Sequence, residues 1–152
     1  MLYIKKGPPK PSVAQKTAEI KRRDDWKNLT EDAPKNEEDA SRYTKILRDM
    51  FEEFTKPDIR DTVIREQHAL CCYCMRRIGN TGRDMRIEHW YPLNMNKRTA
   101  IEYQNFLGAC TGICSDHYIE FQCCDNSKSG KIIELDPRNH SMMDQIRYMI
   151  SV

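Results

Sequence analysis

The chain has 152 residues, 39% of them hydrophobic, and a formal net charge of +2. This length fits one domain with a modest core. A mean hydropathy of -0.80 and the lack of any long apolar run exclude a membrane-spanning segment. The first residues also lack the apolar stretch of a secretory signal, so we expect a cytoplasmic protein that has no membrane partner.

Charge divides the N-terminal part of the chain. Residues 1–28 are rich in Lys and Arg, whereas residues 31–39 are mostly acidic. Several prolines between Gly7 and Pro11 exclude a helix interior or a central strand and predict an extended segment. We expect residues 1–36 to form a basic arm and linker, either solvated or docked on a partner protein, and residues 37–152 to form the folded domain.

Apolar spacing predicts an α+β fold that is mostly helical before the cysteines. The clearest signal is the stripe of apolar side chains at intervals of three and four over residues 37–55. The predicted elements in chain order are a helix over 12–28, a linker over 30–36, a helix over 37–55, a helix over 57–69, a cysteine-bearing turn over 70–79, a strand over 85–91, a helix or turn over 99–107, a helix or turn over 124–132 and an amphipathic helix over 140–150.

The cysteines are clustered. All seven lie between Cys71 and Cys124. A secreted disulfide scaffold usually spreads an even number of cysteines along the chain, whereas clustered thiols in a reducing compartment are more often metal ligands. Cys71-x-x-Cys74 can hold one side of a tetrahedral ion, and zinc takes four such ligands. The pattern therefore predicts a structural zinc site.

We select Cys110 and Cys124 as the second pair of zinc ligands, because Cys124 stands immediately before an Asp-x-x-Lys feature and Cys110 closely follows the Asn105 segment. The alternatives are Cys114 or His117 in place of Cys110, and Cys72 in place of Cys71. The three spare thiols, which we expect to be buried as small apolar groups, are Cys72, Cys114 and Cys123. Because residues 70–130 contain few apolar side chains, bound zinc would supply much of their folding free energy.

Glu88-His89 carries the second chemical signal, together with Asp125. Hydrolysis of a phosphodiester needs a proton acceptor for water, which a neutral imidazole such as His89 provides. It also needs stabilisation of negative charge, which Mg²⁺ (or Mn²⁺) provides when one or two carboxylates hold it. We expect Glu88 and Asp125 to hold this ion. Asn105 can hydrogen-bond the backbone and fix the turn that orients the histidine.

Basic residues near these positions complete the candidate site. Lys128, Lys131 and Arg86 can contact the scissile or flanking phosphates. The alternative interpretation treats Glu88-His89 as a surface pair beside the aromatic residues that follow it.

Several blocks resemble the HNH nuclease component of Septu-type and retron-associated anti-phage systems. They are Lys5-Lys6-Gly7-Pro8, the run from Arg65 to Cys74, the run from Ile87 to Pro92, the run from Tyr103 to Leu107, Cys124-Asp125-x-x-Lys128 with Ser129-Gly130-Lys131, and Leu135-Asp136-Pro137. The resemblance implies a ββα-metal (HNH) finger with a zinc knuckle, flanked by helices. It also implies an ABC-type ATPase as partner and His89 as general base. Asp125 stands where the family usually has His or Asn.

Three functions are compatible with these residues. The first is a metal-dependent endonuclease that cuts phage DNA in complex with the ATPase. The second is an HNH nuclease that cuts RNA, such as a tRNA, because backbone recognition carries little base readout. The third is a zinc-stabilised module that binds nucleic acid or the ATPase without catalysis. The acid–base–acid set of Glu88, His89 and Asp125 favours the nucleases.

Overall fold

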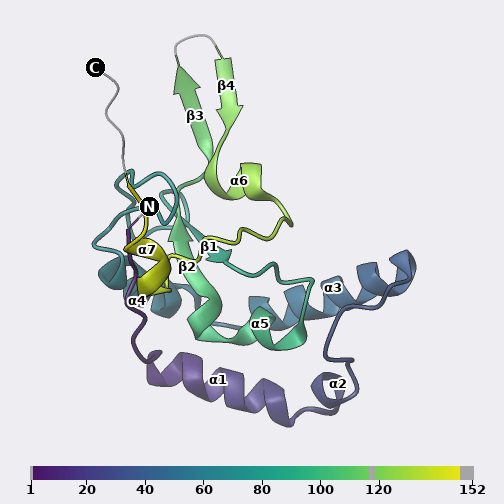
Figure 1. Cartoon of the computed structure of the whole chain (residues 1–152). Helices are drawn as coiled ribbons and strands as arrows, with labels where there is room; N and C mark the ends of the chain where they lie inside the picture. The colour runs from purple at the N-terminus through teal and green to yellow at the C-terminus, as the bar shows by residue number, and fades with distance from the viewer. Residues whose placement is uncertain (1, 117–118, 148–152) are drawn as a thin grey trace.

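The computed structural model describes residues 2–116 and 119–147. For residues 113–116 and 119–121 it describes the backbone alone. The described part is α+β, with seven α-helices, a 3-10 turn and two separate antiparallel hairpin sheets (Figure 1). The elements are α1 (Pro11–Arg22), α2 (Asp24–Lys27), α3 (Glu37–Glu52), α4 (Lys56–Glu66), β1 (Arg86–His89), α5 (Lys97–Ile101), η1 (Tyr103–Asn105), β2 (Phe106–Ala109), β3 (Ile113–Asp116), β4 (Ile119–Gln122), α6 (Cys124–Lys128) and α7 (His140–Met143). None of the described helices is long and apolar enough to cross a membrane.

One hydrophobic core includes the N-terminal segment. Ile4, Val13, Ile20 and Trp26 are buried in the same cluster as the apolar residues of α3, α4 and β2. The backbone N–H of Ile4 donates to Pro137 at 2.8 Å. The structure thus differs from the expected separate arm over residues 1–36, because these apolar side chains gain free energy from burial against the rest of the chain.

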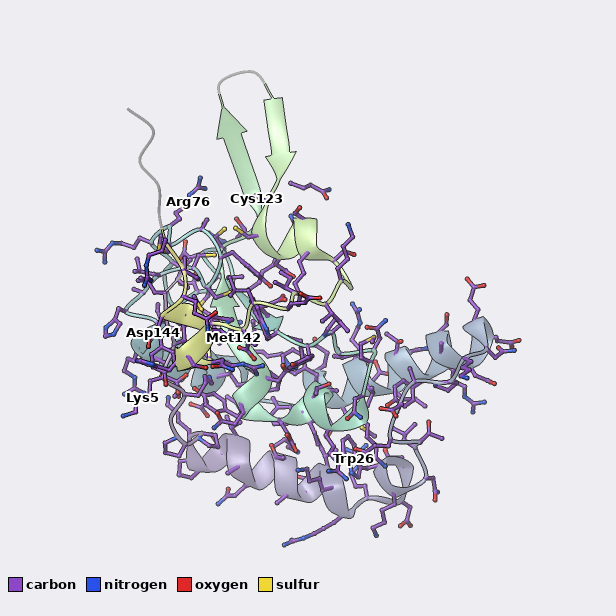
Figure 2. The ribbon with its side chains drawn as sticks, in the orientation of Figure 1. Lys5, Trp26, Arg76, Cys123, Met142 and Asp144 are labelled. Carbon is purple, nitrogen blue, oxygen red and sulfur yellow. The ribbon has the colours of Figure 1, made fainter. Side chains whose placement is uncertain are left out.

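The predicted helix over residues 12–28 is interrupted at Arg23, whose backbone is extended between α1 and α2. The guanidinium of Arg23 donates to Glu53 at 2.6 Å and also pairs with Asp25. These contacts hold the chain in a bend that places Trp26 in the core. Figure 2 labels Trp26 at the end of the molecule where α1 and α2 meet.

Helices α3 and α4 follow the sequence prediction closely. Asn36 caps α3 by accepting hydrogen bonds from two backbone N–H groups of the first turn, as its short amide side chain favours. Helix α4 ends at Glu66, before the predicted end near residue 69. His68 and Ala69 adopt left-handed backbone conformations, with φ of 52° and 59°. A right-handed α-helix requires a negative φ, so α4 cannot continue through them.

Strands β1 and β2 form an antiparallel sheet in which Glu88 pairs with Leu107 and His89 with Phe106. Strand β1 agrees with the sequence prediction. The predicted helix or turn over residues 99–107 is confirmed as far as Asn105 by α5 and η1, and it is wrong for Phe106 and Leu107, which begin β2. All four β2 residues are buried. A short, fully buried strand has no alternation of polar and apolar residues that sequence reasoning can detect.

A second hairpin, β3–β4, which the sequence did not predict, projects from the body beside α6 (Figure 1). Gly112 precedes it with φ of 75°, and a Cβ there would lie 2.7 Å from the carbonyl oxygen of Cys123. Only glycine permits both the conformation and this close approach. Figure 2 labels Cys123 at the base of the hairpin.

The C-terminal helix is shorter than predicted. Helix α7 ends at Met143, with Asn139 as its N-cap, and Asp144 to Arg147 are not helical. The rest of the predicted helix, residues 148–150, lies outside the described residues.

Candidate functional site

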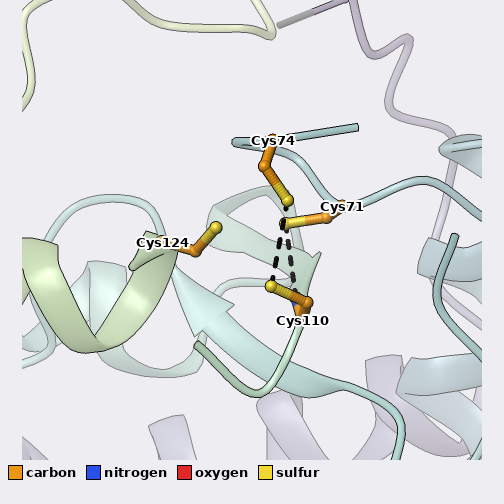
Figure 3. Close-up of side chains that lie close together, drawn as sticks. All are labelled: Cys71, Cys74, Cys110 and Cys124. Atoms are coloured by element: carbon orange, nitrogen blue, oxygen red, sulfur yellow. Dashed lines mark hydrogen bonds between the residues drawn. The ribbon is translucent and has the colours of Figure 1, made fainter. Parts of the chain in front are cut away.

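Four cysteine thiols lie together where the turn after α4, the end of β2 and the start of α6 meet (Figure 3). The Sγ atoms of Cys71, Cys74, Cys110 and Cys124 all lie within 4.8 Å of one another. The Cys74 and Cys110 sulfurs are 3.9 Å apart. Tetrahedral zinc with Zn–S bonds of ~2.3 Å separates its sulfurs by roughly 3.8 Å. These four cysteines, the set selected from the sequence, can therefore hold a metal ion such as zinc.

The electrostatics of the four thiols also fit a cation. A hydrogen bond from the Cys72 thiol, reinforced by backbone N–H groups, lowers the pKa of Cys71 to about 4. One of these groups is the N–H of Cys110, which donates to the Cys71 sulfur at 3.3 Å. Burial raises the pKa of Cys110 and of Cys124. Cys71 is thus ready as a thiolate, whereas Cys110 and Cys124 need a positive charge beside them before they ionise.

The backbone around the thiols is shaped to bring them together. Met75, directly after Cys74, and Cys124 itself both have left-handed conformations, with φ of 59° and 54°. Such conformations are costly for residues other than glycine and concentrate at ligand sites. They turn the chain sharply enough for segments far apart in sequence to converge.

The spare cysteines behave differently from one another. Cys72 is buried and stands outside the four-thiol cluster, as expected. Cys123 is half-buried and takes part in a disulfide bond, so its expected role as a free buried thiol is wrong. The side chain of Cys114 and the whole of His117, the two alternatives to Cys110, lie outside the described part of the chain.

A cleft of about 560 Å³ is lined in part by Asp125, the residue that follows Cys124 of the cluster in the chain. His89, Glu88 and Asp125 all line it, so β1 and α6 bring the three residues of the predicted acid–base–acid set to one place. Helix α3 forms another side, and Pro92 to Asn94 and Ser129 to Gly130 complete the lining.

Glu88 is held firmly at the cleft. Its side chain is 6% exposed, and its Oε1 accepts a hydrogen bond from the Tyr73 hydroxyl at 2.8 Å and another from the Lys128 ammonium. Burial, followed by the neighbouring carboxyl of Asp125, raises the pKa of Glu88 to about 7. A carboxyl group whose ionisation is opposed by burial and by a neighbouring carboxyl is in an arrangement that a divalent cation relieves.

His89 is oriented by a backbone hydrogen bond. Its Nε2 lies 3.0 Å from the carbonyl oxygen of Ala100, and because a carbonyl only accepts, Nε2 carries the proton. In a neutral ring Nδ1 is then the acceptor. The ring packs edge-on against Phe51 and Phe106, with centroids 4.5 and 5.0 Å away. Burial lowers the pKa of His89 to about 4, which keeps the imidazole neutral at pH 7.

Asn105 acts on the backbone. Its amide donates to the carbonyls of Tyr91 and Thr99, and its oxygen accepts from the N–H of Tyr91, each at 2.8 Å. Asn105 is buried and does not line the cleft. These bonds fix the segment between β1 and β2 that carries Ala100, whose carbonyl contacts the His89 ring. Asn105 is therefore placed to orient His89 through the backbone, the role expected from the sequence.

Two of the three expected phosphate contacts are engaged within the protein. The ammonium of Lys128 is buried against Glu88 and donates to the carbonyl of His89 at 2.8 Å. Arg86 pairs with Asp125 at 3.5 Å and contacts Asn126. Lys131 is exposed. As placed, Lys128 therefore supports the site from behind, contrary to the expected phosphate contact.

Sequence reasoning gave no functional role to two residues at this site, Tyr73 and Arg48. Tyr73 lies between the cysteines of Cys71-x-x-Cys74, and its ring stacks on Trp90 while its hydroxyl reaches Glu88. Arg48 lines the cleft from α3. In the sequence, the only indication that Arg48 lies at the cleft is its spacing of four residues from Thr44, which places both on one side of the helix.

Comparisons of the chain with protein-family models, with curated proteins and with solved structures found no match. Functional conclusions therefore depend on the geometry of the four-thiol cluster and the cleft.

Proposed function

We propose that this chain is an HNH-type endonuclease that hydrolyses phosphodiester bonds of phage DNA, in an anti-phage complex with an ABC-type ATPase. The observation that carries the proposal is the meeting of His89, Glu88 and Asp125 in one cleft, with Nε2 of the histidine engaged by a backbone carbonyl. The order β1, β2, α6 is compatible with a ββα-metal finger.

His89 is the general base in this proposal. Its Nδ1 has no hydrogen-bond partner among the described residues, so it is available to accept a proton from water. Phe51 and Phe106, which also contact each other, pack edge-on against the ring, and Asn105 holds the segment that carries Ala100. The imidazole is thus fixed in one tautomer and one orientation before substrate arrives, as proton transfer requires.

Glu88 and Asp125 would hold Mg²⁺ or Mn²⁺. Tyr73 and Lys128 both occupy Oε1 of Glu88, which leaves Oε2 for a cation beside Asp125. When bound, such an ion stabilises the negative charge that develops on the phosphate and on the leaving oxygen. The residues of the cleft orient the substrate and receive the proton.

Zinc would be structural in this protein. Cys71, Cys74, Cys110 and Cys124 supply the four thiolates of a closed site, which has no position open for substrate. The cluster joins the turn after α4 to α6, so the ion would fix Asp125, the residue after Cys124, relative to β1.

The decisive experiment is a cleavage assay with plasmid DNA and with tRNA, in Mg²⁺ or Mn²⁺, with and without the proposed ABC-type ATPase partner. We expect the wild-type protein to cut DNA and His89→Ala to cut neither substrate. His140→Ala is the matched control, because His140 is exposed, does not line the cleft, and contacts Asp144 at 2.8 Å and the ring of Tyr3.

Cutting of tRNA alone would reassign the substrate to RNA. An absence of cutting in every combination, with nucleic-acid binding retained, would instead favour a zinc-stabilised binding module. Cleavage that persists in His89→Ala would refute the assigned base.

A further inference from the structure

The α3 side of the cleft carries a face that the proposed chemistry does not use. Thr44, Arg48 and Glu52 line the cleft and recur at intervals of four, so they stand on one side of the helix. The hydroxyl of Thr44 donates to the carbonyl of Ala40 at 2.8 Å. Glu52 has Lys56 at 3.5 Å, which offsets part of its charge. Arg48 lies between them.

Arg48 is a cation available at the cleft. It is exposed, and within residues 2–116 and 119–147 its guanidinium makes no hydrogen bond or ion pair. Arg86 and Lys128, by contrast, are bound to Asp125 and Glu88. A guanidinium on the cleft wall that has no partner among the described residues gains no stabilising contact there. It is well suited to an anionic ligand.

Two further cations lie on α3 beside Arg48, in a helix that also carries five acidic residues. Lys45 and Arg42 precede Arg48 at intervals of three, which places the three on one inclined row of the helix surface. Both are exposed, and neither forms an ion pair with any described residue. The N-terminal end of α3 extends away from the body of the molecule (Figure 1). The row is therefore open to a large ligand.

The length of the row indicates more than one phosphate. Six residues of helix span about 9 Å at ~1.5 Å per residue. One strand of a nucleic acid carries a phosphate every ~3.4 Å along the helix axis, so the row covers roughly two to three phosphates. A mononucleotide would need only the cation nearest the cleft.

We infer that Arg48, with Lys45 and Arg42 behind it, holds the phosphodiester backbone of a polynucleotide that enters the cleft along α3. The inference rests on the proposed nuclease function and adds a binding track to it. Arg48 contacts a phosphate that flanks the scissile one, and the row guides the strand toward His89. Because such contacts recognise only the backbone, the track binds without sequence preference.

The test measures binding separately from cleavage. Fluorescence anisotropy with a short labelled DNA duplex, and with an RNA hairpin in a parallel arm, is read in the His89→Ala background so that the probe stays intact. We expect Arg48→Ala to weaken binding about tenfold. We also expect it to lower the slope of log affinity against log salt by ~0.9. Arg48→Lys should restore most of the affinity.

The matched control is Arg22→Ala, which removes an exposed arginine from the last turn of α1, outside the cleft. Equal weakening by Arg22→Ala, or unchanged binding in Arg48→Ala, would overturn the inference. In the parent protein, hydrolysis of the small diester bis(p-nitrophenyl) phosphate, which wild type and Arg22→Ala should catalyse equally, measures the chemistry without a polynucleotide.

Failure of the proposed nuclease function has a different signature. Wild-type protein that hydrolyses neither DNA nor bis(p-nitrophenyl) phosphate would refute the nuclease. Weakened binding in Arg48→Ala, measured in the same preparation, would still support nucleic-acid binding along α3. Thermal melting of each variant checks the fold, which an exposed Arg-to-Ala change in a helix should preserve.

Discussion

The ammonium of Lys128 and the carboxylate of Glu88 form a buried ion pair behind the cleft, with side chains 2% and 6% exposed. Lys128 also donates to the carbonyl of His89 at 2.8 Å and lies over the ring of Trp90. A buried pair adds little over a well-packed apolar pair, but removal of one partner leaves an isolated charge in the core. The pair therefore ties the position of α6 to that of β1.

We expect Lys128→Met to lower the free energy of unfolding by about 3–5 kcal/mol, because Glu88 is then buried without its counter-charge. The double variant Lys128→Met with Glu88→Gln should recover most of that loss, although it will lack activity. Urea unfolding of the two single variants and the double variant measures the coupling.

Lys131→Met is the control for this cycle, since Lys131 is an exposed lysine three residues further along. It should change the free energy of unfolding by less than about 0.5 kcal/mol. Equal stability of Lys128→Met and Lys131→Met would show that the ion pair does not exist in solution.

The four-thiol cluster predicts a specific response to metal loss. We expect Cys74→Ser to lose bound zinc and to unfold the region between residues 70 and 130, because zinc binding supplies about 10–16 kcal/mol in small zinc-dependent peptides. Mass spectrometry under native conditions measures the zinc, and absorption of the cobalt-substituted protein reports thiolate ligation.

Cys72→Ala separates ligation from simple burial. Cys72 is buried beside the cluster but is not one of its four thiols. This variant should keep one zinc per chain while losing the packing of a small side chain and the hydrogen bond from its thiol to the Cys71 sulfur. Loss of zinc in Cys72→Ala, with zinc retained in Cys74→Ser, would reassign the ligands.

The role of His89 predicts a selective loss of catalysis. We expect His89→Ala to reduce kcat for DNA cleavage by about 10²–10⁴-fold, the range of general base catalysis, with zinc content unchanged. Single-turnover kinetics measures this step. A loss of kcat that His140→Ala reproduces would point to general destabilisation instead.

Asn105 predicts an effect on both stability and rate. Asn105→Ala removes three hydrogen bonds of a buried amide and leaves backbone groups of Tyr91 and Thr99 without partners. We expect a loss of about 2–3 kcal/mol in the free energy of unfolding. We also expect kcat to fall while KM stays constant, because Ala100 no longer fixes the His89 ring.

Two further variants sharpen this prediction. Asn105→Asp keeps the acceptor but loses both donated bonds, so it should not rescue activity. Asn80→Ala, at an exposed asparagine, should leave kcat unchanged. Full activity in Asn105→Ala would refute the positioning role.

Local signals in the sequence were enough for the helices and for the choice of thiols. The apolar stripe and the Asn36 cap of α3 act within a few residues of each other, so the pattern alone places this helix. The spacing of Cys71 and Cys74 likewise reflects a single turn. Cys110 and Cys124 were chosen from their neighbours in the chain, and the four sulfurs do lie together.

The α+β class, the main helices and the four metal-competent cysteines could be predicted from the chain, because they depend on periodicity, on the Cys71–Cys74 spacing and on motifs next to Cys110 and Cys124. The folded arrangement was needed to see that Ile4 belongs to the core, that β2 is a strand and that Lys128 faces inward, whereas Arg48 forms no ion pair with the described residues. These outcomes depend on which distant segments remove a side chain from water. Burial and ion pairing are properties of the assembled neighbours, and no local pattern encodes them.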